Sequence, residues 1–197
     1  MTTDKNFLID FLDAQSTCIS SLSKNVDQIS QIVKILISAR NSNKIIFTLG
    51  NGGSGSTASH FVSDLLKTAL TKNQKRFKAI SLVDNIPVIL AWSNDVSYDE
   101  IFSEQLKNHL SKGDVVLAFS GSGRSKNIIK ALKFAKKNGA ICIGMTGSSG
   151  GLINNVCDVC IKIPSSDMLT IESQHLTLCH CITNAIRHKG KPVFKYE

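Results

Sequence analysis

The sequence predicts an α/β protein in which helices cover both faces of a five-stranded, mostly parallel sheet. The result would be a three-layer αβα sandwich preceded by two N-terminal helices. The 197 residues suffice for one such domain and are too few for two full α/β halves. From residue 44 onward, short apolar runs alternate with stretches of helical spacing, a pattern typical of buried parallel strands and their crossover helices. Before residue 44, only helical spacing occurs.

The first 43 residues are expected to form two helices without glycine or proline. In the first, Phe7, Leu8, Phe11 and Leu12 recur at helical spacing, and the second has a broad apolar stripe from Val26 to Leu36. Neither helix has residues that suggest catalysis. We therefore expect residues 1–43 to be a helical extension used in oligomer packing, followed by the α/β domain at 44–189 and a tail at 190–197.

The remaining elements follow from alternating apolar runs and helical spacing. The expected strands are 44–49, 77–83, 114–119, 140–146 and 156–163, and the expected helices are 54–70, 87–92, 99–109, 125–138 and 168–188. Each strand is short and apolar, as strands covered on both faces are. Ligands of such sheets bind beyond the carboxyl ends of the strands, so the loops after the strands are the candidate site.

Composition and charge limit the class of protein. No segment is apolar enough to span a membrane, and the N-terminus does not resemble a signal peptide, so we expect a cytoplasmic protein without a membrane partner. The net charge is +8, but only 6% of residues are aromatic, which favours a solvated basic surface over a nucleic-acid interface. The six cysteines are expected to be reduced and packed, and Cys157–Cys160 has no second CxxC that would complete a zinc site.

Two loops suit a phosphorylated ligand. Residues 50–56 (GNGGSGS) follow the first strand and residues 120–125 (SGSGRS) follow the third, and both lead into helices. Hydroxyls and backbone N–H groups at a helix start bind phosphate. Neither loop ends in the GK[ST] of a nucleotide P-loop, so a sugar phosphate fits better than ATP. A third loop at 146–151 is expected to be a structural turn.

Ionisable residues accompany these loops. His60 and Asp64 lie four apart on one helix face, which suits two ligands of a metal or an acid/base pair. Glu172, His175 and His180 lie on the last helix, where core packing is the commoner explanation for a lone histidine. Asn94 and Asp95 either bind sugar hydroxyls or form a turn with a helix cap.

The order of these motifs, GNGGS, HFxxD, SNDVSYD at 93–99, SGSGRS and the Glu172–His180 helix, resembles the sugar isomerase (SIS) family and, within it, the phosphoheptose isomerases. The resemblance covers nearly the whole chain. It implies the SIS fold and a cytoplasmic homotetramer with active sites between subunits and zinc in some members. The implied reaction is the interconversion of sedoheptulose 7-phosphate and D-glycero-D-manno-heptose 7-phosphate, a step toward lipopolysaccharide or other surface polysaccharide.

The resemblance also implies residue roles. It places sugar-phosphate contacts at Asn51, Gly52, Gly53, Asn94, Asp95, Ser120, Gly121, Ser122 and Ser125. It makes Asp64, Glu172 and His180 catalytic, and His60, Asp64, Glu172 and His180 metal ligands. Four positions depart from the family pattern: Asp64 replaces Glu, Glu172 replaces Gln, Gly121 replaces Thr, and Arg124 replaces Asn. The second carboxylate could compensate for the shorter first one, and the loop changes suggest a related phosphosugar.

These residues suggest proton transfer through a cis-enediolate. Asp64 or Glu172 would move the proton between C1 and C2, and His180 would protonate or deprotonate the carbonyl and hydroxyl oxygens. Glu172 and His180 lie about 12 Å apart along a helix and about 80° apart around it, so they share one ion only if both lean inward or one serves a neighbouring subunit. The alternatives are a non-catalytic SIS-fold protein that binds a phosphosugar or a replication initiator, and an isomerase of a related phosphosugar. Deamination or amination of a hexosamine phosphate is a weaker expectation, because we recognise no N-terminal glutaminase-like domain in this sequence.

Overall fold

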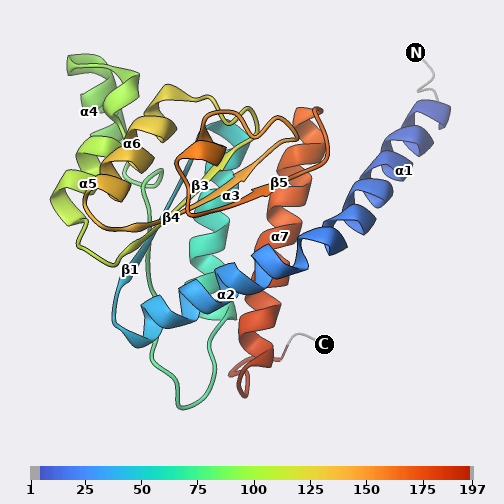
Figure 1. Ribbon diagram of the computed structural model, residues 1–197, viewed down its shortest axis with the longest axis horizontal. Coiled ribbons are helices and arrows are strands. Elements are labelled where there is room, and N and C mark those ends of the chain that lie inside the picture. Colours follow the sequence, from blue (N-terminus) through green and yellow to red (C-terminus); the bar gives the residue numbers. More distant parts are fainter. Residues whose placement is uncertain (1–4, 196–197) are drawn as a thin grey trace.

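The computed structural model describes residues 5–195, so the outermost residues of the expected N-terminal extension and C-terminal tail lie outside it. Figure 1 shows a central sheet with helices on both faces and one long helix extending from the body. The strands are β1 (Ile45–Gly50), β2 (Lys78–Ser81), β3 (Val115–Ser120), β4 (Ile141–Thr146) and β5 (Val159–Lys162). The helices are α1 (Lys5–Ser21), α2 (Val26–Asn41), α3 (Gly52–Ser63), α4 (Ile86–Asp95), α5 (Ser103–His109), α6 (Lys126–Lys137) and α7 (Met168–His188).

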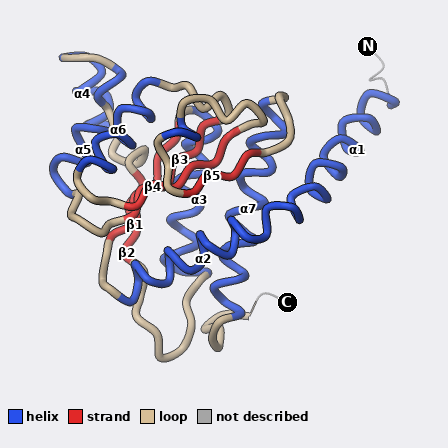
Figure 2. The backbone as a smooth tube through the Cα atoms, viewed as in Figure 1, coloured by secondary structure: helices blue, strands red, loops and turns tan. Residues whose placement is uncertain are grey.

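The five strands form one parallel sheet in the order β2-β1-β3-β4-β5, which confirms the predicted fold class (Figure 2). After β2 the chain returns across β1 to begin β3. The strand order therefore changes direction between β1 and β3, and ligands of open α/β sheets bind at such a point. The buried carboxylate of Asp114 joins these strands at their other ends, accepting hydrogen bonds from the backbone N–H groups of Ile45 (3.0 Å) and Ser111 (2.8 Å).

Side chains of the central strands alternate between two apolar cores. Ile46 and Leu117 belong to the core covered by α2, α3 and α7, whereas Phe47 and Val116 belong to the core covered by α5 and α6. Because both faces are covered, β3 reads as an apolar run from Val115 to Phe119, and the apolar run of β1 is interrupted only by Thr48. The two cores hold the carboxyl ends of β1 and β3 rigidly beside each other.

Several predicted boundaries shift, for local reasons. The expected helix 54–70 begins at Gly52, and its last part, Asp64–Thr68 (η2), is a π-helical turn. The expected strand 156–163 is only four residues long. The backbone N–H groups of Val156 and Cys157 still donate to Ile153 O of the preceding 3-10 turn, and the Asp158 side chain accepts a hydrogen bond from Cys142 N–H (2.8 Å). The helical pieces at 87–92 and 99–109 are α4, a 3-10 turn at Tyr98–Glu100 and α5.

The two N-terminal helices are confirmed, and they differ in packing. α2 lies against β5 and α7, whereas α1 extends beyond the body in Figure 1 and buries only Cys18. Phe7 and Leu12 are 67% and 64% exposed. At the other end of the chain, residues 190–193 run antiparallel to 70–72. No helix within residues 5–195 has the length and apolar character needed to cross a bilayer.

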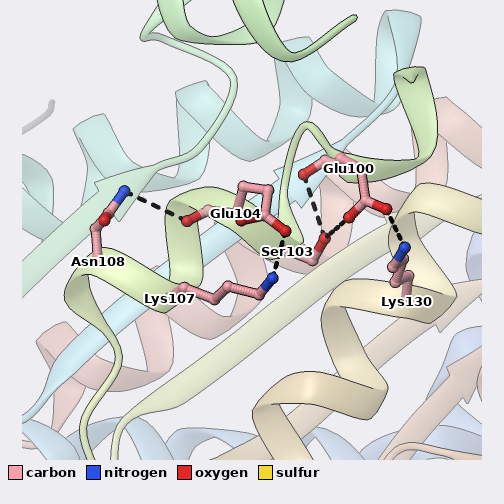
Figure 3. A network of polar contacts seen from close by, with 6 residues as sticks. All are labelled: Glu100, Ser103, Glu104, Lys107, Asn108 and Lys130. Atoms are coloured by element: carbon pink, nitrogen blue, oxygen red, sulfur yellow. Dashed lines mark hydrogen bonds and ion pairs between the residues drawn. The ribbon is translucent and has the colours of Figure 1, made fainter. Parts of the chain in front are cut away.

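Polar contacts fasten α5 to α6 on the outer face (Figure 3). Glu100 forms an ion pair with Lys130 and accepts a hydrogen bond from the Ser103 hydroxyl (3.0 Å), while Glu104 pairs with Lys107. The lysine partner and the Ser103 hydrogen bond lower the pKa of Glu100. Ion pairs this exposed contribute little stability each. The Glu100–Lys130 pair joins the 3-10 turn at Tyr98–Glu100 to α6, whereas the Glu104–Lys107 pair lies within α5.

All six cysteines are free thiols, as predicted, but Cys181 is exposed rather than packed. Its position on the outer side of α7 explains this difference, since an apolar helix still has one solvent-facing stripe. Burial raises the pKa of Cys142 to about 12 and that of Cys160 to about 11. These thiols therefore remain protonated at neutral pH and behave as small apolar side chains.

Candidate active site

The two predicted ligand loops lie side by side, because β1 and β3 are adjacent and end at the same edge of the sheet. The first loop turns very tightly: a Cβ on Gly50 would lie 2.4 Å from the backbone oxygen of Ser54. Only glycine permits that approach. The second loop is supported from beneath by the third, since a Cβ on Gly123 would lie 2.4 Å from the Gly150 oxygen. The third loop thus has the structural role expected of it.

The larger cavity beside the first loop has a volume of about 600 Å³. Asn51, Gly52 and His60 line it on one side, and Asp84 and Tyr98 line it on another. The helix α3 begins at Gly52 and provides unpaired backbone N–H groups at this point. A cavity of this size, with hydroxyls, amides and an imidazole, suits a small polar ligand.

A second cavity, of about 280 Å³, separates the two loops. Its lining includes every predicted contact of the second loop and three of the first, namely Asn51, Gly52, Gly53, Ser120, Gly121, Ser122 and Ser125. Glu172 and Met168 of α7 complete its wall. A Cβ on Gly53 would lie 2.3 Å from Glu172 Oε2, so glycine is required for the carboxylate to reach the start of α3. Negative charge is favoured at that helix end.

The predicted pair His60 and Asp64 meets His180 of α7 on the other side of α3. The Nε2 atoms of His60 and His180 are 3.1 Å apart, and they lie 3.8 and 3.9 Å from Asp64 Oδ2. Both imidazoles are about half exposed, whereas Asp64 is 7% exposed and also accepts a hydrogen bond from the Thr183 hydroxyl (3.4 Å). We call His60, Asp64 and His180 the imidazole–carboxylate cluster. It also borders a third cavity, of about 300 Å³, that reaches Arg187.

The donor set of this cluster fits a zinc ion. Two imidazole nitrogens and one carboxylate oxygen lie within 4.8 Å of one another, the single such group among the described residues. Ligands at bond lengths of about 2.0–2.1 Å in a tetrahedral site lie about 3.3 Å from each other, close to the 3.1–3.9 Å found here. A fourth position would remain for a ligand, as in catalytic zinc sites.

Glu172 is not a member of the cluster, although it was predicted as a metal ligand with His180. It lies one cavity away, beside Gly53 and the serine loop. Eight residues of helix separate it from His180, and its side chain leans toward the start of α3. Asn94 and Asp95 lie at the exposed end of α4, bonded to each other (2.8 Å) and outside the linings of the two cavities beside the loops.

Sequence reasoning missed three side chains here. Tyr98 and Asp84 line the larger cavity, and the buried side chain of Asn127 is bonded to Asn51. Tyr98 belongs to the SNDVSYD segment, so a signal existed for it. Asp84 and Asn127 lie in segments that look like an ordinary turn and an ordinary helix start, and only the fold brings them to the site.

A model of the SIS domain matches residues 10–147. A protein of Aliarcobacter butzleri named phosphoheptose isomerase is 35% identical over 185 residues, 91% of this chain and 96% of its own length. One of Thermoplasma acidophilum named probable phosphoheptose isomerase is 38% identical over 168 residues, 85% and 92% of the two chains.

Solved structures agree with these sequence relatives. The structure of a phosphoheptose isomerase from Francisella tularensis superposes with a TM-score of 0.88 at 26% identity, covering 95% of this chain and all of that one. A phosphoheptose isomerase structure from Neisseria gonorrhoeae gives a TM-score of 0.87 at 25% identity, with 93% and 98% coverage. The likeness therefore covers nearly the whole chain.

Proposed function

The chain belongs to the SIS domain family and, within it, to the phosphoheptose isomerases, and from this premise we propose that it interconverts sedoheptulose 7-phosphate and D-glycero-D-manno-heptose 7-phosphate. The observation that best supports this proposal is that the imidazole–carboxylate cluster reaches, through His60, the cavity beside the first of two phosphate-type loops. Proton carriers and a phosphate pocket together are what an aldose–ketose isomerase needs. A protein that only binds a phosphosugar has no use for His60, Asp64 and His180 together.

The reaction moves one proton between carbons and one between oxygens. In the ketose-to-aldose direction, a carboxylate removes a proton from C1, a cis-enediolate forms, and the proton returns at C2. We assign this transfer to Asp64, whose side chain is only 10% exposed and therefore shielded from competing water. His180 takes the O1 hydroxyl proton and delivers one to O2. Glu172 is the alternative carboxylate, since it lies in the adjacent cavity.

We assign the sugar phosphate to the two cavities beside the loops. Ser120, Ser122 and Ser125 offer hydroxyls at the start of α6, and Gly121 leaves room for backbone donors. The two cavities share a wall formed by Asn51 and Gly52, and Gly53 lines the second cavity. Asn94 and Asp95 stay proposed contacts of the sugar hydroxyls, which they could reach only in an assembly or after a rearrangement of α4.

We further propose that His60, Asp64 and His180 hold zinc, with Glu172 as a fourth ligand if its side chain turns from Gly53. A bound dication would polarise the carbonyl oxygen and stabilise negative charge on the enediolate. The packing of α3 directly on α7 brings His60 and His180 together even without an ion.

The assembly that we propose is a cytoplasmic homotetramer. Two helices expose apolar surface that a partner copy would cover: α1, through Phe7 and Leu12, and α4, which buries none of its residues. Leu90 is 62% exposed on a helix composed mostly of apolar residues. In this proposal residues 1–43 serve assembly, residues 44–189 bind the sugar phosphate, and the product is used for heptose-containing surface polysaccharide.

The test is to incubate the purified protein with sedoheptulose 7-phosphate in D₂O, with added Zn²⁺ or with a chelator, and to follow both sugars by NMR. We expect the aldose to appear, with deuterium at C2 in the fraction of turnovers in which the protonated carboxylate exchanges with solvent before the proton is returned. Binding without conversion would favour the non-catalytic alternative. Conversion without deuterium would mean that the proton removed from C1 is returned to C2 before it exchanges with solvent, or that hydrogen moves directly between the two carbons.

A further inference from the structure

The side chain of Asn127 links the two ligand loops. It lies in the first turn of α6, directly after the serine loop, and is 2% exposed. Its Oδ1 accepts a hydrogen bond from the backbone N–H of Ile128 (2.9 Å), which can only donate. The orientation of the Asn127 carboxamide is thereby fixed, with its Nδ2 group available to another partner.

That partner is Asn51 of the first loop. Asn127 Nδ2 donates to Asn51 Oδ1 (2.9 Å), and Asn51 Nδ2 donates in return to Asn127 Oδ1 (3.1 Å). The Tyr98 hydroxyl also donates to Asn51 Oδ1 (2.9 Å). Both lone pairs of that oxygen are therefore used, and one N–H of the Asn51 carboxamide is left for a further partner.

We propose that Asn127 and Tyr98 are positioning residues that lock the Asn51 carboxamide so that it presents an N–H donor, never an acceptor, to the ligand. Asn51 lines both cavities beside the loops, so this donor faces the space assigned to the sugar phosphate. A fixed N–H group selects an electron-rich oxygen: a phosphate oxygen, or the oxyanion that develops on the enediolate. The inference rests on the proposed function and adds a defined polarity to one of its contacts.

The lock connects three segments that are distant in sequence. Asn51 follows β1, Tyr98 lies in the 3-10 turn before α5, and Asn127 begins α6. The carboxamides of Asn51 and Asn127 each donate a hydrogen bond to the other. Loss of one of these bonds therefore allows the Asn51 carboxamide to rotate. The released amide can then turn its oxygen toward a negatively charged ligand, which repels it.

Two variants separate positioning from folding. Asn127→Asp keeps the acceptor for Ile128 but removes the Nδ2 donor to Asn51, and we expect kcat/KM to fall by about tenfold to a hundredfold. Tyr98→Phe removes one hydroxyl from a half-exposed ring, so the fold should persist while kcat/KM falls by about three- to tenfold. Asn138→Asp is the matched control: it makes the same chemical change at the far end of α6, where the side chain only donates to Phe134 O.

Steady-state kinetics, calorimetric binding of sedoheptulose 7-phosphate and the unfolding midpoint are measured for each protein. The proposal is supported if Asn127→Asp and Tyr98→Phe lose kcat or raise KM while Asn138→Asp matches the wild type and Tyr98→Phe unfolds at the wild-type temperature. It is overturned if both variants keep wild-type kinetics, or if their losses only follow the fraction of unfolded protein. If the wild type binds the phosphosugar without converting it, the proposed function fails. The affinities of the variants for the phosphosugar then still test whether Asn127 and Tyr98 position the Asn51 carboxamide. A wild type that neither binds nor converts it overturns both.

Discussion

His175 and His180 lie five residues apart on α7 and have opposite surroundings. His180 is half exposed and faces His60 and Asp64, whereas His175 is fully buried against Phe119, with its ring 5.8 Å from that ring. Neither ring nitrogen of His175 has a well-aligned hydrogen-bond partner. Five residues turn a helix by about 140°, which carries the second imidazole from the core to the cleft beside α3.

The comparison shows that burial, more than residue type, determines what an imidazole can do. Burial lowers the pKa of His175 to about 4, only partly offset by the nearby Thr146 carbonyl. His175 is therefore neutral at physiological pH and packs as an aromatic ring. His180 is half exposed and faces His60 and Asp64, so its ring nitrogen is accessible to a substrate or to a cation.

The largest effect is expected from Asp64→Asn. The change keeps the shape and the hydrogen bond from Thr183, but it removes the charge that His60 and His180 face. We expect isomerisation to fall by about 10³-fold and zinc affinity to fall with it, while circular dichroism and the unfolding midpoint stay close to the wild type. His180→Ala should reproduce the loss. Full turnover by either variant would contradict the role of the cluster.

The second prediction concerns the buried histidine. Since the folded-state pKa of His175 is about 4 and its ordinary value is 6.5, the unfolded chain binds a proton first as the pH falls. The contribution of neutral His175 to the free energy of unfolding should be fully present above about pH 7. It should decline by roughly 3 kcal/mol as the pH approaches about 4. Urea denaturation across this range measures the decline.

His175→Leu should remove most of this pH dependence, whatever its effect on stability at neutral pH. A glutamine at the exposed His109 is the control, and it should keep the wild-type profile. An unchanged decline in His175→Leu would show that other groups cause the acid sensitivity.

The sequence predicted much of this site, and its limits have physical causes. The parallel sheet, the two loops and the His60–Asp64 pair follow from local patterns, because glycine-rich turns and i,i+4 spacing act over a few residues. The contrast between His175 and His180 does not, since both stand among apolar neighbours and only packing against β3 and α3 separates them. The Asn51–Asn127 pair spans 76 residues, beyond any local pattern.

Glu172, nearer the start of α7 than the two histidines, is expected to contribute less to catalysis than Asp64. Its carboxylate lies beside Gly53, outside the imidazole–carboxylate cluster, so Glu172→Gln should reduce kcat/KM by about tenfold, well below the effect of Asp64→Asn. Zinc affinity, measured by competition with a chromogenic chelator, should change less than in Asp64→Asn. A loss as large as that of Asp64→Asn in both measurements would instead show that Glu172 turns from Gly53 to bind the ion and that it, not Asp64, carries the proton.

The smallest effect is expected at the start of α7, which supports both histidines. Asp167 caps this helix by accepting a hydrogen bond from Thr170 N–H (2.7 Å), and that bond lowers the pKa of Asp167. Asp167→Ala should lower the unfolding midpoint by a few degrees, whereas Asp167→Asn retains a capping oxygen and should stay close to the wild type. Because fraying would begin in the first turn of α7, three turns before His180, the kinetics of folded Asp167→Ala should match the wild type. A kinetic loss in Asp167→Ala but not in Asp167→Asn would mean that the two environments on α7 are coupled through the helix itself.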